Sequence, residues 1–474
     1  MRKLDKFLNL KIPIGKKRDN NPALKVKVID FAFVLCVIIL SLNARLALFP
    51  MISGDYVGFL GPWLHRIREL GGFYSLGHEI SNYSSAYMII MSFLSYLNAD
   101  PLYSIKAVSV FFDYVAALAV FSLLFVLTES PRRAIIGMSA FLMMPTGILN
   151  SAYWGQCDMI YAAFVLLGLC YYCRGSTETA MWLTAVAFAF KLQALFILPF
   201  YIIMWLRPYI MKNGERATVK LYHFLPIPIP YLLFTIPGIF FGRDIWNSIG
   251  VYFLQAGGYY PWLTLNYPNI YAFFGQTYLL EPQIAELGRA GLLTTILALG
   301  TLAYFIYVKN VRMNANMMVT TALFSLCLLL YGLPHMHERY GILIDVLAVV
   351  YAVLRPRQIP VAIGLITSSL MSYMLFLFGR ESLPPLHHAI FQLGLIIFVG
   401  RDLYRQAMLQ HKNPVLKPAQ AELVITAKGD SRNDGIKNDE NNNSQGQVGI
   451  DDFASPRPES GDLVEGIPNH QNHE

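Results

Sequence analysis

Charged side chains are scarce in this chain. Asp, Glu, Lys and Arg make up 14% of the 474 residues, whereas 55% are hydrophobic. Soluble globular domains carry roughly 25% charged residues, so most of this chain has too little charge to cover a water-facing surface. The composition therefore predicts a protein that crosses a membrane several times.

Several common patterns are also missing. There is no Walker loop, and no GxGxxG motif between a strand and a helix, which argues against ATP-driven transport and a nucleotide-sugar domain. No alternating ten-residue strand pattern recurs, so the spanning segments are predicted to be helices. The five cysteines include no pair typical of a disulfide framework, and we interpret the isolated CxxC at 170–173 as chance rather than a metal or redox site.

Eleven apolar segments have spanning or near-spanning length. They cover residues 28–48, 104–127, 134–150, 158–173, 179–206, 220–241, 287–308, 315–333, 340–354, 359–378 and 386–400. The 179–206 segment is flanked by basic residues at both ends, so we expect two short helices that form a hairpin with Lys191 and Gln193 at its tip. The prediction is an all-α polytopic transmembrane helix bundle of about 11 to 13 spans.

Basic residues set the orientation of these segments. A run of Lys and Arg precedes the first segment, and the loops that contain Arg132, Arg207 and Arg355 are also basic. The positive-inside rule places the N-terminus and these loops in the cytoplasm. Residues 1–27 are thus a basic cytoplasmic segment and residues 28–411 the transmembrane domain. Residues 412–474 are polar and rich in Asn, Asp, Gly and Ser, so we expect a cytoplasmic, largely disordered tail.

The same orientation collects the polar-rich insertions on the extracytoplasmic side. They cover residues 49–103, 151–158, the tip at Lys191, and residues 242–286, 334–340 and 379–388. The first of these loops is expected to carry interfacial helices, one of them over residues 83–98. Since only Lys and Arg in the other loops set the orientation, this convergence predicts one outward-facing site.

Four ionisable side chains lie in the segment His335-Met336-His337-Glu338-Arg339, directly between two apolar runs. Such a cluster is costly at a membrane boundary unless it has a role. Arg339 could bind a phosphodiester with its guanidinium fork, either His could donate a hydrogen bond, and Glu338 could orient them. A zinc site and a structural ion-pair network are the alternatives, although the HxHE spacing differs from HExxH and no third ligand is evident.

Two aspartates are candidates for chemistry or for capping. Asp55 follows the first span, where a partly desolvated carboxylate could act as a general base, and Gly-Asp is also common in turns. Asp158 could cap the next span. Trp154 and Gln156, which precede Asp158, suit stacking on a sugar and recognition of its hydroxyls.

Lys191 stands in an otherwise apolar run, where an unpaired ammonium is expensive. It must snorkel, pair with an acid or bind an anion, and we favour a phosphate ligand. The loop over residues 242–286 is rich in Tyr, Trp and Phe. These aromatics predict a belt at the membrane interface, or a sugar-stacking lid or isoprenoid groove.

At four places the chain resembles the GT-C superfamily of multi-span glycosyltransferases, and most closely bacterial relatives of the GPI mannosyltransferase II family. The places are, in order, Gly54-Asp55-Tyr56, Trp154-Gly155-Gln156-Cys157-Asp158, Phe190-Lys191-Leu192-Gln193 and His335-Met336-His337-Glu338-Arg339-Tyr340. The resemblance implies a GT-C-like bundle that uses a lipid-phosphate-linked sugar, with Asp55 as the catalytic acidic residue. Many relatives place two acidic residues close together in the first outer loop, whereas Tyr56 follows Asp55 here, so we expect no obligatory metal or cofactor.

The expected activity is an inverting transfer of a hexose, of mannose or glucose type, from a polyprenyl phosphate to a glycan, glycolipid or protein acceptor outside a bacterial-type cytoplasmic membrane. Asp55 would be the base. The donor phosphate would be bound by Lys191, His335, His337 and Arg339, and the supporting or acceptor-binding residues would be Asp158, Gln156, Trp154, Gln193 and Glu338. A transporter or flippase for lipid-linked sugar intermediates is the alternative, and a non-catalytic scaffold for envelope assembly is a third reading.

Overall fold

The computed structural model describes residues 11–14, 24–257, 262–275 and 280–412. The chain divides into the unit Met1–Pro414 and the unit Val415–Glu474, and the second lies outside the described residues. The predicted tail at 412–474 therefore falls outside the described part, apart from Lys412. Of the predicted N-terminal segment, β1 (Lys11–Ile14) and β2 (Leu24–Lys27) are described, and they pair as an antiparallel ribbon.

The unit Met1–Pro414 is an all-α polytopic helix bundle, as predicted. Seven helices in its described residues are long and apolar enough to cross a membrane. They are α2 (Val28–Leu48), α5 (Pro101–Thr128), η5 with α11 (Leu221–Phe224 and Pro228–Phe240), α14 (Glu281–Val308), α15 (Ala315–Gly332), η8 with α17 (Pro356–Gln358 and Ile359–Phe378) and α18 (Pro385–Lys412). The number is eight if α6 (Pro131–Leu142) and the bent stretch after it, α7 (Pro145–Ile148) with η3 (Leu149–Tyr153), count as one span.

Four further apolar helices are shorter than a bilayer is thick. They are α4 (Ser85–Ser95), α8 (Asp158–Cys173), η4 with α10 (Leu192–Ile197 and Leu198–Leu206) and α16 (Ile342–Leu354). Each of the eleven predicted apolar segments thus contains helix, and α4 lies where an interfacial helix is expected. Length alone assigns seven or eight spans, so the remaining predicted spans would have to come from these shorter helices.

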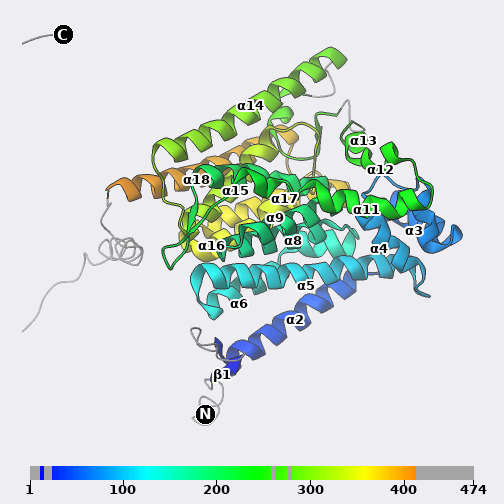
Figure 1. The fold of residues 1–474 in the computed structure, drawn as a ribbon, viewed down its shortest axis with the longest axis horizontal. Coiled ribbons are helices and arrows are strands. Elements are labelled where there is room, and N and C mark those ends of the chain that lie inside the picture. Colours follow the sequence, from blue (N-terminus) through cyan, green and yellow to red (C-terminus); the bar gives the residue numbers. More distant parts are fainter. Residues whose placement is uncertain (1–10, 15–23, 258–261, 276–279, 413–474) are drawn as a thin grey trace, which may run out of the picture. The chain divides into compact units, whose positions relative to one another are not determined.

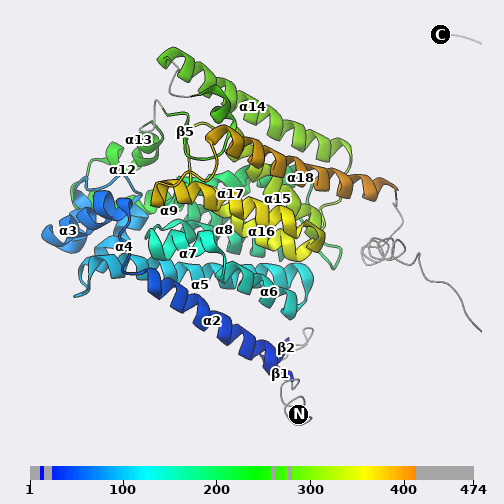
Figure 2. The same ribbon diagram turned by 180° about the vertical axis from the view of Figure 1, so that it is seen from behind.

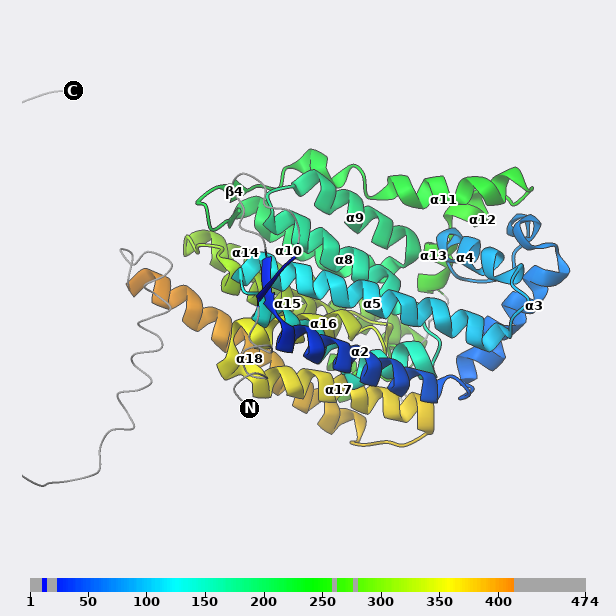
Figure 3. The same cartoon turned by 90° about the horizontal axis from the view of Figure 1, so that it is seen from below.

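One end of the bundle collects the short helices, as Figures 1 and 2 show. These are α3 (Gly61–Glu69), α4, α12 (Ile245–Ile249) and α13 (Val251–Gly257), and we call this the loop end. In the interior, α8 packs between α5 and α9 (Thr177–Phe190), an arrangement that can be followed in Figure 3. The core of the unit lies along these helices and along α15 and α16.

The predicted hairpin at residues 179–206 is confirmed. Helix α9 ends at Lys191, whose extended backbone (φ −155°, ψ 136°) breaks the helix before η4 and α10 return. Lys191 binds Asp158 at the start of α8. Tyr209, which follows α10, contacts Tyr172 near the other end of α8. The tip of the hairpin therefore reaches the loop end.

Two buried polar contacts attach α2 to α5. The Arg45 guanidinium binds the Asp113 carboxylate, with 2.7 Å between Nε and Oδ2 and both side chains fully buried. Lys106 donates to the carbonyls of Leu48, Phe49 and Met51 at 2.5–3.0 Å, which caps the C-terminal end of α2. Because Asp55 follows this end of α2 by seven residues, these contacts fix the start of the first loop.

Candidate active site at the loop end of the bundle

Asp55 lies just before the π-turn η1 (Tyr56–Leu60) that leads into α3. Its Oδ2 accepts a hydrogen bond from Trp154 Nε1 at 2.8 Å and another from Gln156 Nε2, and Arg339 Nη1 lies 3.5 Å away. Oδ1 makes no hydrogen bond to any residue that the structure describes, and the side chain is 14% exposed. The carboxylate is thus fixed through one oxygen and open at the other.

The donors to Asp55 are positioned by the turn that follows α7. Ser53 Oγ donates to the carbonyl of Trp154 at 2.8 Å, which ties this turn to the first loop. Gly155 has φ +79°, a left-handed backbone that glycine adopts without steric cost. The Trp154 ring stacks on Phe376 of α17, with 4.7 Å between ring centroids. Neither donor can turn away from Asp55 without disturbing this packing.

Tyr83 extends the network on the first-loop side. Its hydroxyl donates to Gln156 Oε1 at 3.0 Å. Burial raises the pKa of Tyr83 to about 12, so the phenol keeps its proton and remains a donor at neutral pH. The amide of Gln156 is thereby held in the orientation that presents its Nε2 to Asp55.

Asp158 is the second acidic residue of the site, and it is 2% exposed. Its carboxylate binds Lys191 Nζ, accepts from Asn150 Nδ2 at 2.8 Å and lies 3.8 Å from Arg339 Nε. It makes side-chain contacts rather than the backbone contacts of an N-cap. Lys191 is 4% exposed and lies over the Tyr83 ring, so Asp158 and Lys191 form a buried ion pair.

The His-Met-His-Glu-Arg segment contacts residues 262–265 of the aromatic loop. Strand β6 (Met336–His337) pairs in parallel with β5 (Thr264–Leu265). His335 has φ +62°, and its Nδ1 lies 2.5 Å from the carbonyl oxygen of Trp262. Arg339, at the end of the segment, contacts Asp55, whereas His335 is turned onto the loop.

Glu338 connects His337 to Arg339. Its two oxygens lie 3.5 Å from His337 Nδ1 and 3.5 Å from Arg339 Nη1. Burial lowers the pKa of the His337 imidazole from its ordinary value of 6.5, against the opposing effect of Glu338. His337 is therefore neutral at pH 7, and it acts as a hydrogen-bonding group rather than as a cation.

The site has one more carboxylate than it has cations. Asp55, Asp158 and Glu338 face Lys191 and Arg339, which leaves one net negative charge. The contacts of Arg339 are 3.5–3.8 Å long, whereas charge-assisted hydrogen bonds measure about 2.7–2.9 Å. An incoming anion can compete for this guanidinium. Lys191, by contrast, is committed to Asp158.

Eight of the ten predicted site residues meet in this cluster. They are Asp55, Trp154, Gln156, Asp158, Lys191, His337, Glu338 and Arg339. His335 binds the aromatic loop instead. Gln193 is buried on η4, and its Oε1 has no hydrogen-bond partner in the described part of the chain. The described residues hold no group of three or more His, Cys, Asp or Glu side chains arranged for a metal.

Tyr83 and Asn150 join this network although neither is predicted as a site residue from the sequence. Asn150 could have been noticed as an amide at the end of an apolar run, eight residues before Asp158. Tyr83 carries no local signal, because its role depends on a contact with Gln156 across 73 positions of the chain.

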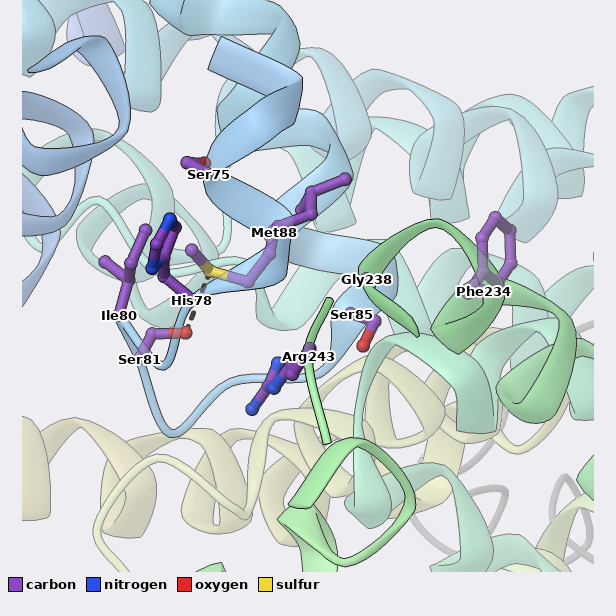
Figure 4. A pocket seen from close by; sticks show the side chains of 10 residues that line it. Ser75, His78, Ile80, Ser81, Ser85, Met88, Phe234, Gly238 and Arg243 are labelled. Atoms are coloured by element: carbon purple, nitrogen blue, oxygen red, sulfur yellow. Dashed lines mark hydrogen bonds between the residues drawn. The ribbon is translucent and has the colours of Figure 1, made fainter. Parts of the chain in front are cut away.

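Two hollows lie against the first loop beside this cluster. An open groove of about 410 Å³ is lined by Trp63, Arg66, His78 and Glu79, among others. Trp63 packs edge-on against Tyr83, with 5.2 Å between ring centroids, so the groove wall is continuous with the Asp55 network. The smaller pocket, shown in Figure 4, has room for about one water molecule and lies between the first loop and Arg243.

A comparison with protein-family models and with curated proteins found no match.

Proposed function

We propose that the protein transfers a hexose, of mannose or glucose type, from a polyprenyl-phosphate sugar to an acceptor hydroxyl, with inversion at the anomeric carbon. The carboxylate of Asp55 is the observation that carries this proposal. One of its oxygens is held by two hydrogen bonds, and the other is free to receive a proton. A general base must be both oriented and accessible, and Asp55 is both.

The reaction is a single displacement. The acceptor oxygen attacks the anomeric carbon while its proton passes to Asp55 Oδ1. The bond between the anomeric carbon and the phosphate oxygen breaks, and its electron pair leaves with the polyprenyl phosphate. Negative charge grows on the departing phosphate, and in this proposal Arg339 and neutral His337 stabilise it. No metal is required by this scheme.

The remaining residues hold these groups in place. Asp158 and Glu338 face Arg339 from two sides and orient its guanidinium. Lys191 compensates the charge of Asp158, so in this proposal the donor phosphate meets Arg339 rather than Lys191. The groove beside Trp63 has the volume and the mixture of aromatic and polar walls that suit a sugar of the acceptor.

The proposal places the loop end outside a bacterial-type cytoplasmic membrane, with both termini in the cytoplasm. Its support is the basic character of loops at the opposite end of the bundle, such as those at Arg132 and Arg355. Lipid-linked donors lie in the bilayer with their phosphate at its surface. A site at the end of an apolar bundle suits such a donor.

Labelled polyprenyl-phosphate mannose and polyprenyl-phosphate glucose, incubated with the purified protein and a mixture of glycan acceptors, test the proposal. We expect release of label from the lipid and a product of inverted anomeric configuration. A protein that moved lipid-linked sugars across the membrane without chemistry would leave both donors intact while changing their sidedness in vesicles. Intact donors under all acceptor conditions would contradict the transferase assignment.

A further inference from the structure

Four aspartates of the bundle are fully or almost fully buried, and one of them differs from the rest. Asp113 pairs with Arg45, Asp158 with Lys191, and Asp402 with Arg355. Asp345, on α16, is 0% exposed and forms no ion pair with any residue that the structure describes. Its carboxylate is a buried acid without a protein cation.

The neighbours of Asp345 are neutral oxygen groups. Ser369 Oγ of α17 donates to Asp345 Oδ1 at 2.7 Å. Asp345 Oδ2 is buried and has no hydrogen-bond partner in the described part of the chain. The Thr146 hydroxyl of α7 lies beside the carboxyl without completing a hydrogen bond.

Two further oxygens, on α7 and η3, are buried without partners among the described residues. They are Thr146 Oγ1 and Asn150 Oδ1, four positions apart along α7 and η3. Asn150 Nδ2 points toward Tyr373 of α17, which lies one helical turn after Ser369. Thr146 of α7 and Ser369 of α17 therefore both lie against Asp345 of α16, and Asn150 contacts Tyr373 one helical turn farther along.

An ionised carboxylate in such a place needs a positive charge, because its desolvation costs several kcal/mol. The titratable groups that the packing brings near Asp345 are Tyr161 of α8, Tyr267, Cys327 of α15 and Tyr373, and none is a cation. None of the described side chains near Asp345 supplies that charge.

We propose that Asp345 is the centre of a binding site for one monovalent cation, sodium or a proton, inside the bundle. A sodium ion would take Asp345 Oδ2 and Thr146 Oγ1 as oxygen ligands, which satisfies two unpartnered atoms at once. A proton would neutralise the carboxyl directly. Both occupants supply the one missing positive charge.

The site is linked to the cluster around Asp55. Asn150, which donates to Asp158, lies four residues after Thr146 along α7 and η3. Helix α16, which carries Asp345, begins three residues after Arg339. Occupancy by a cation would hold Asn150 and the start of α16 in place and thereby steady Asp158 and Arg339. This inference does not depend on the proposed transferase activity.

Thermal unfolding of the full chain in detergent, in NaCl and in choline chloride of equal ionic strength, tests the sodium arm. If sodium is the occupant, the midpoint rises with NaCl concentration in the wild type and not in Asp345→Asn. Asp244→Asn, an exposed aspartate whose N-cap role asparagine retains, should keep the wild-type response. Thr146→Val should raise the half-saturating sodium concentration by about fivefold through loss of one neutral ligand.

Infrared difference spectroscopy tests the proton arm and needs no stable variant. If a proton is the occupant, the wild type shows a protonated carboxyl band at pH 7 that Asp345→Asn lacks, and stability is indifferent to sodium. Stability then falls as pH rises, because the folded state alone retains that proton. A wild type with no sodium response and no protonated carboxyl band would overturn the proposal.

Discussion

Among single residues, the orientation of the Asp55 side chain matters most for the proposed reaction. A carboxylate on a loop normally samples several rotamers. Asp55 Oδ2, however, accepts hydrogen bonds from residues 154 and 156, about a hundred positions away in the chain. Such preorganisation fixes the direction in which the free oxygen points. The donors should therefore matter for turnover more than for substrate binding.

Trp154→Phe tests whether these hydrogen bonds orient Asp55, because it removes the Nε1 donor and keeps an aromatic ring for the stack on Phe376. We expect kcat to fall about tenfold with little change in KM, since the loss loosens the base and not the substrate pocket. Steady-state transfer assays measure both constants. Trp246→Phe, at a tryptophan that is 76% exposed, is the matched control and should behave as wild type.

Protonation of His337 makes the folding stability of the protein depend on pH. Burial lowers its pKa below 6.5, so the unfolded chain binds more protons than the folded chain as pH falls through this range. Folding stability should therefore decline below about pH 6.5, and His337→Gln should reduce that decline. Chemical unfolding at pH 5 to 8 measures the effect. Equal pH profiles for both proteins would show that His337 is not the group responsible.

Among the helices, α2 and α9 end close to two of the candidate site residues: Asp55 follows α2 by seven residues, and Lys191 lies at the break after α9. The basic residues at both ends of the 179–206 segment predicted the hairpin with Lys191 at its tip from local sequence alone. The hydrogen bonds to Asp55 and the ion pair of Lys191 with Asp158 could not be predicted from local sequence, because they join distant positions of the chain. The turning of His335 onto residue 262 depends on the parallel ladder of β5 and β6, which no local pattern reveals.

Lys106 fixes the end of α2 by donating to three of its carbonyls. Lys106→Met should leave these acceptors unsatisfied, cost about 1–3 kcal/mol of stability and speed amide exchange over residues 49–57. Hydrogen exchange with mass spectrometry resolves this stretch. Lys212→Met, at a half-exposed lysine paired with Glu129, should leave exchange there unchanged.

At the scale of the whole molecule, the bundle brings four separate chain segments to one end. The sequence indicated this convergence, because Lys and Arg in the other loops left the polar-rich insertions on a common side. It could not give the number of spans, because α8 and α16 have intermediate length. Nor could it foresee Asp345 as an acid without a cation, which depends on the packing of α7, α16 and α17.

Accessibility to a membrane-impermeant maleimide tests the orientation of the bundle. Glu69 and Arg132 are exposed residues at opposite ends of the unit. We expect Glu69→Cys to be labelled in intact cells and Arg132→Cys only after the membrane is opened. Four of the five natural cysteines are buried and Cys36 is exposed, so labelling of the wild type is measured as the background and subtracted. The reverse pattern would place the site in the cytoplasm and contradict a lipid-linked donor on the outer side of the membrane.

The most direct measurement compares sugar release from labelled polyprenyl-phosphate donors by the wild type, Asp55→Asn and Glu69→Gln. The account predicts that Asp55→Asn, which keeps the shape of the side chain and removes the base, loses at least about 100-fold in rate. Glu69, an exposed acid of the same loop paired with Arg66, should be replaceable without effect. Full turnover by a folded Asp55→Asn protein would contradict the central claim.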